Sequence, residues 1–182
     1  MIFYEYECDL IDKTYEICEK YQFEELDEDR SYIKIEFTGN CQHYTWDDFN
    51  TKFEYYRTTE KICEQQIEPY FKKCWKELEK LNIFEKYEWD YDDYTCWYLY
   101  FNNNFINTLK VYDIIKENRY KVTNIDYSEY ENVISVDFVI WGDEGLIDKI
   151  CNKLDSYDHI EPEASWNDED GSYDINVRIN KI

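Results

Sequence analysis

The sequence predicts an α+β fold, with an antiparallel sheet and helices packed on one of its faces. Two periodicities indicate this class. Short segments alternate apolar and polar residues as half-buried strands do, and longer segments repeat apolar residues at the spacing of a helix. The order of the segments is a third observation. From Tyr94 onward it reads β-α-β-β-α-β-β, which contains the β-α-β-β-α-β arrangement of ferredoxin-like folds.

The first half of the chain is expected to alternate strands and helices. The expected elements are a strand at 2–8, a helix at 10–23, an acidic connector at 24–30, a strand at 31–37 and a helical region from about 46 to 82. Thr45 begins the sequence TWDD and can cap the helical region. Pro69 predicts a kink or a break near residue 68.

A hairpin is expected next, around the sequence YEWDYDDYTCWYLY (87–100). Its strands cover 84–91 and 94–101, with a tight turn near Asp92 and Asp93. Aromatic and acidic residues alternate strictly from Tyr87 to Asp92. A strand with this pattern shows rings on one face and carboxylates on the other.

The remaining elements give the second half its regular order. They are a helix at 102–118, strands at 120–127 and 132–141, a helix at 144–154, and strands at 157–163 and 172–179. Asp143 is expected to cap the second of these helices. Asp170 and Gly171 lie between Trp166 and Tyr173 and predict a hairpin turn.

The domain organisation follows from length and from the absence of a linker. No stretch of Gly, Ser or Pro marks a boundary, and 182 residues can bury a sizeable core. We therefore expect one compact domain over residues 1–182. The alternative is a subdivision into a β-α-β-α half (1–83) and a ferredoxin-like half (84–182).

Charge is the strongest global feature. The chain has 42 acids against 20 bases, a formal net charge of −22, and the surplus extends along its whole length. Such a field repels nucleic acid and anionic membranes and attracts basic surfaces. We expect a basic nucleic-acid-binding protein as partner, with no direct contact to nucleic acid or membrane.

Other classes of function find little support in the sequence. Seven cysteines without a CxxC pair, and a first segment unlike a signal peptide, favour reduced thiols in the cytoplasm. No catalytic motif occurs, and NDEDGSYD (167–174) does not fit a calcium-binding loop. We expect a protein that is not an enzyme and that uses neither cofactor nor metal.

Three groups of acids are the candidate partner-binding residues. They are Glu24, Glu25, Asp27, Glu28 and Asp29 in EELDEDR; Glu88, Asp90, Asp92 and Asp93 in the expected hairpin; and Asp168, Glu169 and Asp170 near the last turn. Acids at alternate strand positions are about 6.7 Å apart, whereas duplex DNA carries one charge per about 1.7 Å of axis. One acidic strand is too dilute to imitate a duplex, but several side by side approach its charge density.

In size, charge, aromatic content and lack of motifs, the chain resembles the small acidic anti-CRISPR proteins of phages and mobile elements in low-GC Firmicutes, in particular inhibitors of Cas9. The resemblance is diffuse and rests on features such as EELDEDR and YEWDYDDY. It implies a target with a positively charged channel, where carboxylates take the place of DNA. The alternative is an immunity protein that neutralises a basic nuclease toxin, since such proteins are also small, acidic and aromatic.

Overall fold

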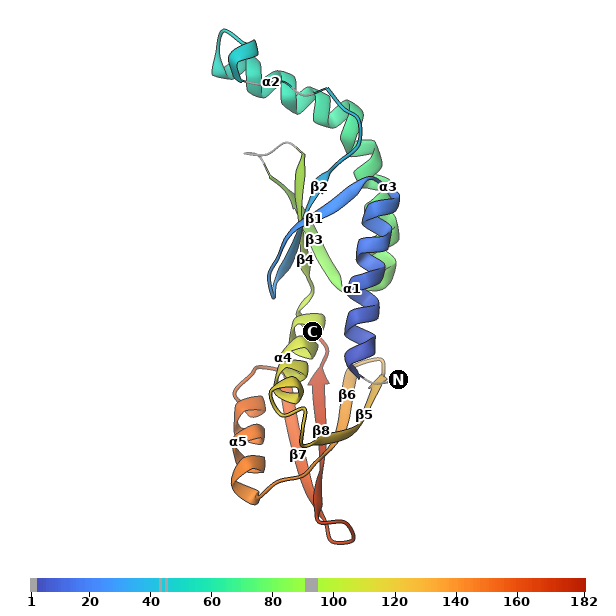
Figure 1. Cartoon of the computed structure of the whole chain (residues 1–182), viewed down its shortest axis with the longest axis vertical. Coiled ribbons are helices and arrows are strands. Elements are labelled where there is room, and N and C mark those ends of the chain that lie inside the picture. The colour runs from blue at the N-terminus through green and yellow to red at the C-terminus, as the bar shows by residue number, and fades with distance from the viewer. Residues whose placement is uncertain (1–2, 43, 45, 91–94) are drawn as a thin grey trace. The chain divides into compact units, whose positions relative to one another are not determined.

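The computed structural model describes residues 3–42, 44, 46–90 and 95–182. Helices and two four-stranded antiparallel sheets form the fold (Figure 1), which confirms the α+β class. Contacts within the chain define two compact units. One comprises Leu10–Asn102, and the other comprises Asn103–Ile182 with the N-terminal residues up to Asp9.

The first unit contains a sheet with the strand order β1-β2-β4-β3. The elements from the N-terminus to Asn102 are α1 (Phe3–Lys20), β1 (Phe23–Glu28), β2 (Tyr32–Phe37), the 3-10 turn η1 (Trp46–Asp48), α2 (Lys52–Ile62), the π-helical segment η2 (Cys63–Ile67), α3 (Glu68–Leu78), the 3-10 turn η3 (Glu79–Leu81), β3 (Phe84–Trp89) and β4 (Cys96–Phe101). All neighbouring strands of this sheet are antiparallel.

Aromatic side chains fill the core of the first unit. Phe71 of α3 stacks on Trp97 of β4 with ring centroids 4.8 Å apart, and its edge meets Phe23 and Tyr87. Tyr87 thus points to the helix side of β3, whereas Glu88 contacts Lys86 and lies on the opposite face. The predicted alternation of rings and carboxylates is confirmed up to Asp90, and the expected turn at Asp92 and Asp93 lies outside the described residues.

The strand expected at 2–8 is wrong, because α1 is helical from Phe3 onward. The alternation of aromatic and acidic residues there imitates a strand over a few positions. Leu10, Thr14 and Cys18 are buried at intervals of four residues, which is the spacing of one helix face, and the same helix includes the preceding residues. The helix expected at 10–23 is confirmed as far as Lys20.

The acidic connector expected at 24–30 is wrong over most of its length, because Phe23–Glu28 forms β1. Phe23 is fully buried and anchors the strand, which pairs with β2. β1 lies at the edge of its sheet, so its charged side chains reach water without breaking the pairing. The run of acids is typical of a loop, but the buried side chain of Phe23 fixes the segment as a strand of the sheet.

The helical region expected from about 46 to 82 is confirmed as a series of helical segments. Its main helix is capped by Thr51, whose Oγ1 accepts a hydrogen bond from the Glu54 N–H at 3.2 Å, while Thr45 lies outside the described residues. The π-helical segment η2 comes directly before α3, and Pro69 occupies the first turn of α3. Because proline lacks an N–H, the helical hydrogen bonding changes here, as predicted near residue 68.

The second unit contains the other sheet, with the strand order β5-β6-β8-β7. Its elements are α4 (Asn103–Glu117), β5 (Val122–Glu129), β6 (Val133–Ile140), α5 (Glu144–Asp155), β7 (Ile160–Asn167) and β8 (Ser172–Asn180). Both helices pack on one face of this sheet, around a core that includes Ile115, Val136, Ile150 and Val177. Asp143 caps α5 as predicted, with its Oδ1 accepting from the Leu146 N–H at 2.9 Å.

The expected order β-α-β-β-α-β-β is present along the chain, but its first strand belongs to the other sheet. β4 pairs with β2 and β3, so the boundary between the units lies after Asn102, not after residue 83. The strand expected at 157–163 begins only at Ile160, because His159 has a φ of 68° and ends the preceding turn. Each unit therefore has a complete antiparallel sheet of its own.

Two further findings concern the chain as a whole. The described helices include none that is both long and apolar enough to cross a membrane. The cysteines whose side chains are described are all free thiols, and burial raises the pKa of several of them, Cys63 to about 12.

Candidate functional site

The acids of β1 expected to bind a partner do not all lie on one face of their sheet. Within β1, Glu24 and Asp27 face the side of the sheet that carries Glu36 and Lys34. Glu28 faces the helix side, where it accepts a hydrogen bond from the Tyr15 hydroxyl at 2.6 Å. Glu25 lies opposite Ile35, on this same helix side, and also raises the pKa of Tyr15, although burial of that phenol is the larger cause.

Glu88 and Asp90 lie on the same outer face as Asp27, and both are already paired. Glu88 binds Lys86 at 2.6 Å and accepts from the Tyr100 hydroxyl, and Asp90 binds Lys34 at 2.8 Å. Lys34 and Lys86 therefore compensate the charges of Asp90 and Glu88 on this outer face.

The remaining predicted acids shape turns or are not described. Asp29 accepts hydrogen bonds from the N–H and the hydroxyl of Ser31. In the turn between β7 and β8, Asp168 accepts from Trp166 and Asp170 accepts from Ser172. Gly171 in this turn has a φ of 73°, which confirms the predicted hairpin turn. Glu169 belongs to the same turn, and Asp92 and Asp93 lie outside the described residues.

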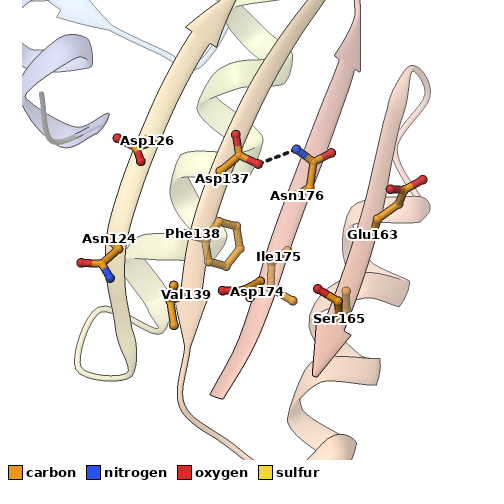
Figure 2. A pocket seen from close by; sticks show the side chains of 11 residues that line it. Asn124, Asp126, Asp137, Phe138, Val139, Glu163, Ser165, Asp174, Ile175 and Asn176 are labelled. Atoms are coloured by element: carbon orange, nitrogen blue, oxygen red, sulfur yellow. Dashed lines mark hydrogen bonds between the residues drawn. The ribbon is translucent and has the colours of Figure 1, made fainter. Parts of the chain in front are cut away.

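The second unit carries a different acidic surface on the sheet face away from its helices, here called the open face. One row of directly opposed residues crosses all four strands: Asp126 on β5, Asp137 on β6, Asn176 on β8 and Glu163 on β7 (Figure 2). The next row consists of Ser128, Ser135, Arg178 and Glu161. Asp174 lies one row away on the other side, opposite Val139 and Ser165.

A small hydrogen-bond network fixes the centre of the open face. The Asn176 side-chain amide donates to Asp137 and, at 2.9 Å, to the Ser135 hydroxyl. The Ser135 hydroxyl donates in turn to Asp137 at 3.3 Å. The amide of Asn180 holds Glu161 at 2.8 Å on the neighbouring strand. These contacts hold Asp137 and Glu161 by neutral donors. Arg178 lies opposite Glu161 on β8, whereas the residues opposite Asp137 include no cation.

Other charged groups of the open face have no partner at all among the described residues. The carboxylates of Asp126, Glu163 and Asp174 make neither a hydrogen bond nor an ion pair there, and the same holds for the guanidinium of Arg178. Asp126 and Asp137 lie directly opposite each other on neighbouring strands, a placement that is unfavourable for like charges. The open face thus keeps ionised groups available for a ligand.

The open face is hollowed because short side chains line its middle. A hollow of about 750 Å³ is bordered by the row from Asp126 to Glu163, and a second of about 700 Å³ adjoins it around Arg178. Asp137 and Asn176 border both hollows, so together they form one depression.

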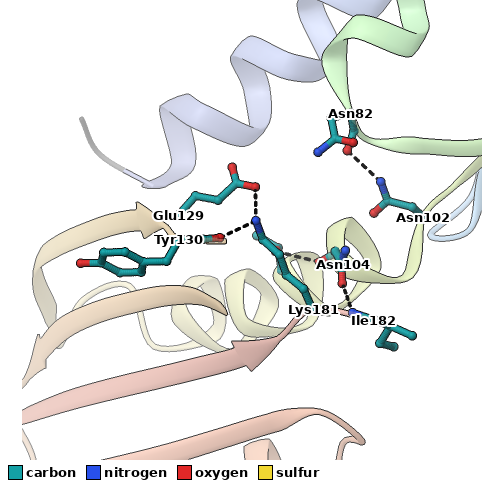
Figure 3. Close-up of polar contacts among 8 residues, drawn as sticks. Asn82, Asn102, Asn104, Glu129, Tyr130, Lys181 and Ile182 are labelled. Atoms are coloured by element: carbon teal, nitrogen blue, oxygen red, sulfur yellow. Dashed lines mark hydrogen bonds and ion pairs between the residues drawn. The ribbon is translucent and has the colours of Figure 1, made fainter. Parts of the chain in front are cut away.

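One end of the sheet is tied down by the last residues of the chain. Lys181 binds the Glu129 carboxylate at 2.7 Å and donates to the Tyr130 carbonyl at 2.6 Å, and the Ile182 N–H donates to Asn104 (Figure 3). These contacts hold the turn between β5 and β6, where Tyr130 borders the second hollow. The Tyr130 side chain is 63% exposed, so its ring is available at this end of the open face.

Comparison with known proteins identifies no relative. No family model, no curated protein and no solved structure matches this chain. Within the described part of the chain, no three His, Cys, Asp or Glu side chains are grouped as metal ligands. Function must therefore be inferred from the open face itself.

Sequence reasoning missed the open face because its acids are single residues inside strands. A signal was nevertheless present in SYDINVRIN (172–180), where Asp174, Asn176, Arg178 and Asn180 alternate with buried aliphatic residues. That pattern predicts a polar sheet face with both signs of charge. Runs of acids drew attention instead, although most of those runs serve the local structure.

Proposed function

We propose that the protein is an acidic inhibitor that binds the basic nucleic-acid-binding surface of a bacterial defence nuclease. In its most specific form the proposal names Cas9 as the target and blocked DNA binding as the mechanism, in the bacterial cytoplasm. The protein catalyses no reaction in this proposal and uses no cofactor. Its open face supplies the contact.

The observation that carries the proposal is the group of uncompensated carboxylates on the open face. Asp126 and Asp137 stand opposite each other and Glu163 completes their row, with no cation in that row. Places where a fold breaks a local rule without compensation are commonly functional. Arginine or lysine side chains of a partner would relieve the repulsion between these acids and gain charge-assisted hydrogen bonds.

The density of charge on the open face also supports the proposal. Neighbouring strands are about 4.8 Å apart, and successive rows about 6.7 Å apart, so the carboxylates of three adjacent rows occupy about 14 by 14 Å. Over 14 Å of axis a DNA duplex carries about eight phosphates, of which about half face one side. The open face offers five carboxylates in this area, Asp126, Asp137, Glu161, Glu163 and Asp174, against the one cation Arg178. The net charge of −4 is close to the same number.

The experiment compares two triple variants with equal net charge. One removes charge from the open face (Asp126→Asn, Asp137→Asn, Glu163→Gln). The other removes it from exposed acids elsewhere (Glu24→Gln, Glu64→Gln, Glu85→Gln). Binding of labelled target DNA by the Cas9–guide complex is measured in a gel shift. Wild type and the second variant should abolish the shift, and the first should need at least about tenfold more protein, a loss of about 1.4 kcal/mol.

Two outcomes would decide against parts of the proposal. Undisturbed DNA binding at excess wild-type protein rejects Cas9 as the target. Equal loss in both variants shows that total charge matters and not the open face. Thermal unfolding serves as the folding control, and the open-face variant should be at least as stable as wild type because opposed like charges are removed. Inhibition of a nuclease toxin instead would identify an immunity protein.

A further inference from the structure

The size of the open face fits one particular kind of protein element. Four strands span about 14 Å between the outer two, and the open positions of β6, from Val133 to the residue after its end, Trp141, cover about 26 Å. An α-helix with its side chains is about 10–12 Å across. The opposite face of this sheet already carries α4 and α5. A helix is therefore the natural occupant by width and length.

The depression on the open face has a shape that can accommodate a helix lying parallel to the strands. Its floor consists of short side chains, among them Ser135, Val139 and Ser165, and the depression lies over them. Tyr130 stands at one end with 63% of its surface exposed. Trp141 follows β6 at the other end, keeps the strand pairing through its N–H bond to Lys121, and is 44% exposed. Exposed aromatic rings at the ends of a recess are typical anchors for a partner.

Charge selects the sequence and the direction of such a helix. The surplus of carboxylates requires lysines or arginines on the side that the helix presents. Asp174 and Arg178 are four residues apart on β8, about 13 Å, which equals about nine residues of helix. A helix has a positive N-terminus and a negative C-terminus, so these two unpaired side chains favour one orientation.

We propose that the open face binds an α-helix of its partner, basic on the side that contacts the sheet, with its N-terminal end on the Asp174 side and its C-terminal end on the Arg178 side of the open face. That the partner is a nuclease rests on the proposed function above, whereas helix binding by the open face does not depend on it. Binding through a helix also explains why the centre of the sheet holds short neutral groups such as Ser135 and Asn176, because long side chains would exclude the helix.

The test uses synthetic peptides and the full chain. One 18-residue peptide is helical and has its lysines and arginines on one face. A second has the same composition with cations spread around the helix, and a third contains two prolines and cannot form a helix. Fluorescence anisotropy should show at least about tenfold tighter binding of the first peptide. Equal affinity for all three would overturn the proposal.

Two single substitutions, neither of which changes the net charge, test whether the peptide binds in the depression of the open face. Ser165→Trp places a large ring in the depression and should weaken binding of the first peptide at least about tenfold. Asn152→Trp, on the exposed side of α5, is the matched control and should have no effect. Equal effects of both substitutions would contradict peptide binding at the open face. Urea unfolding of each variant distinguishes a blocked binding site from a misfolded protein.

The orientation of the bound peptide can be measured separately by nuclear magnetic resonance. A nitroxide label on the N-terminus of the peptide should broaden the amide signals near Asp174, and a label on the C-terminus should broaden those near Arg178. Reversed broadening would overturn the assigned direction.

Occupation by a second copy of this chain is a separate outcome. Self-association of the protein alone in sedimentation, lost on substitution of an exposed aromatic residue of α2, would identify that helix as the occupant and overturn the proposal of a foreign partner. The inference and the proposed function fail separately. If the protein binds the helical peptide but leaves every nuclease active, helix binding by the open face is supported and the inhibitor function is rejected.

Discussion

Glu77 shows how one acid of the first unit acts in the structure of the protein and not in binding. It lies on α3 and receives two hydrogen bonds from Lys20 at 2.7 and 2.8 Å and one from the Tyr21 hydroxyl at 2.6 Å. The bond from Lys20 is the largest cause that lowers the pKa of Glu77, and the bond from Tyr21 adds to it. The carboxylate therefore links α3 to the end of α1.

This contact predicts a pH-dependent stability. A carboxyl whose pKa is lower in the folded state stabilises the protein above its unfolded pKa of about 4.3. That contribution is lost as the pH falls through the folded value. Glu77→Gln should therefore unfold at lower urea concentration than wild type at pH 7, and the difference should shrink below pH 4. Glu64→Gln is the control, because this exposed carboxylate makes no side-chain hydrogen bond or ion pair within the part of the chain that the structure describes. A difference independent of pH would contradict the ionic origin.

Single residues also show what sequence reasoning can detect. Asp143 was predicted as a helix cap from its position before an apolar stripe, and the structure confirms it. The opposed pair Asp126 and Asp137 was not detected, because its two members are far from each other in sequence and meet only through strand pairing. Local interactions are visible in a sequence, whereas cross-strand neighbours require the register.

Among the α-helices, α2 is unusual because it buries none of its residues. Its main neighbours are η1 and η2, the segments that precede and follow it in the chain. Phe53 is 72% exposed, whereas Phe71 of α3 is 1% exposed. The helix is thus held by continuity with η2 and not by packing on the sheet.

The contrast between α2 and α3 predicts that replacing a phenylalanine by alanine has unequal effects on stability in the two helices. Phe71→Ala removes a buried ring and should reduce the free energy of unfolding by about 3–5 kcal/mol. Phe53→Ala should change it by no more than about 0.5 kcal/mol. Urea unfolding followed by fluorescence measures both. A loss above about 1 kcal/mol for Phe53→Ala would show that α2 packs more tightly than its exposure indicates.

The sequence located most elements but misjudged two of them. Helices such as α4 and α5, and strands with strict alternation, such as β2 and β8, were predicted close to their observed bounds. The first turns of α1 and the strand β1 were missed because acidic residues obscured the few buried positions, and tertiary packing then decided the structure. Pattern alone could not settle segments so poor in aliphatic residues.

At the scale of the whole molecule, two cores account for the separation into units. The C-terminal core is built from α4, α5 and the strands β5 to β8 and uses no residue of the first sheet. Sequence reasoning placed the possible boundary at 83/84 because it could not know that β4 closes the first sheet. Which strands share a sheet depends on pairing partners, and these leave little trace in local sequence.

This organisation predicts that residues 103–182 fold by themselves. The fragment should show mixed helix and strand signals in circular dichroism and one cooperative urea transition. Val136→Asp buries a charge in its core and should abolish the transition. A gradual loss of signal in the unsubstituted fragment would mean that this core depends on the rest of the chain.

The edge strands have a further consequence for a chain so rich in tyrosine. Open sheet edges can recruit other chains into fibrils, and aromatic strands promote this. Here β1 carries four acids, β7 contains Pro162, and the pairings of β1, β3 and β5 are interrupted by register shifts. Each edge thus bears a charge, a bulge or a proline that discourages intermolecular pairing. We therefore expect the protein to resist fibril formation at high concentration despite its many tyrosines.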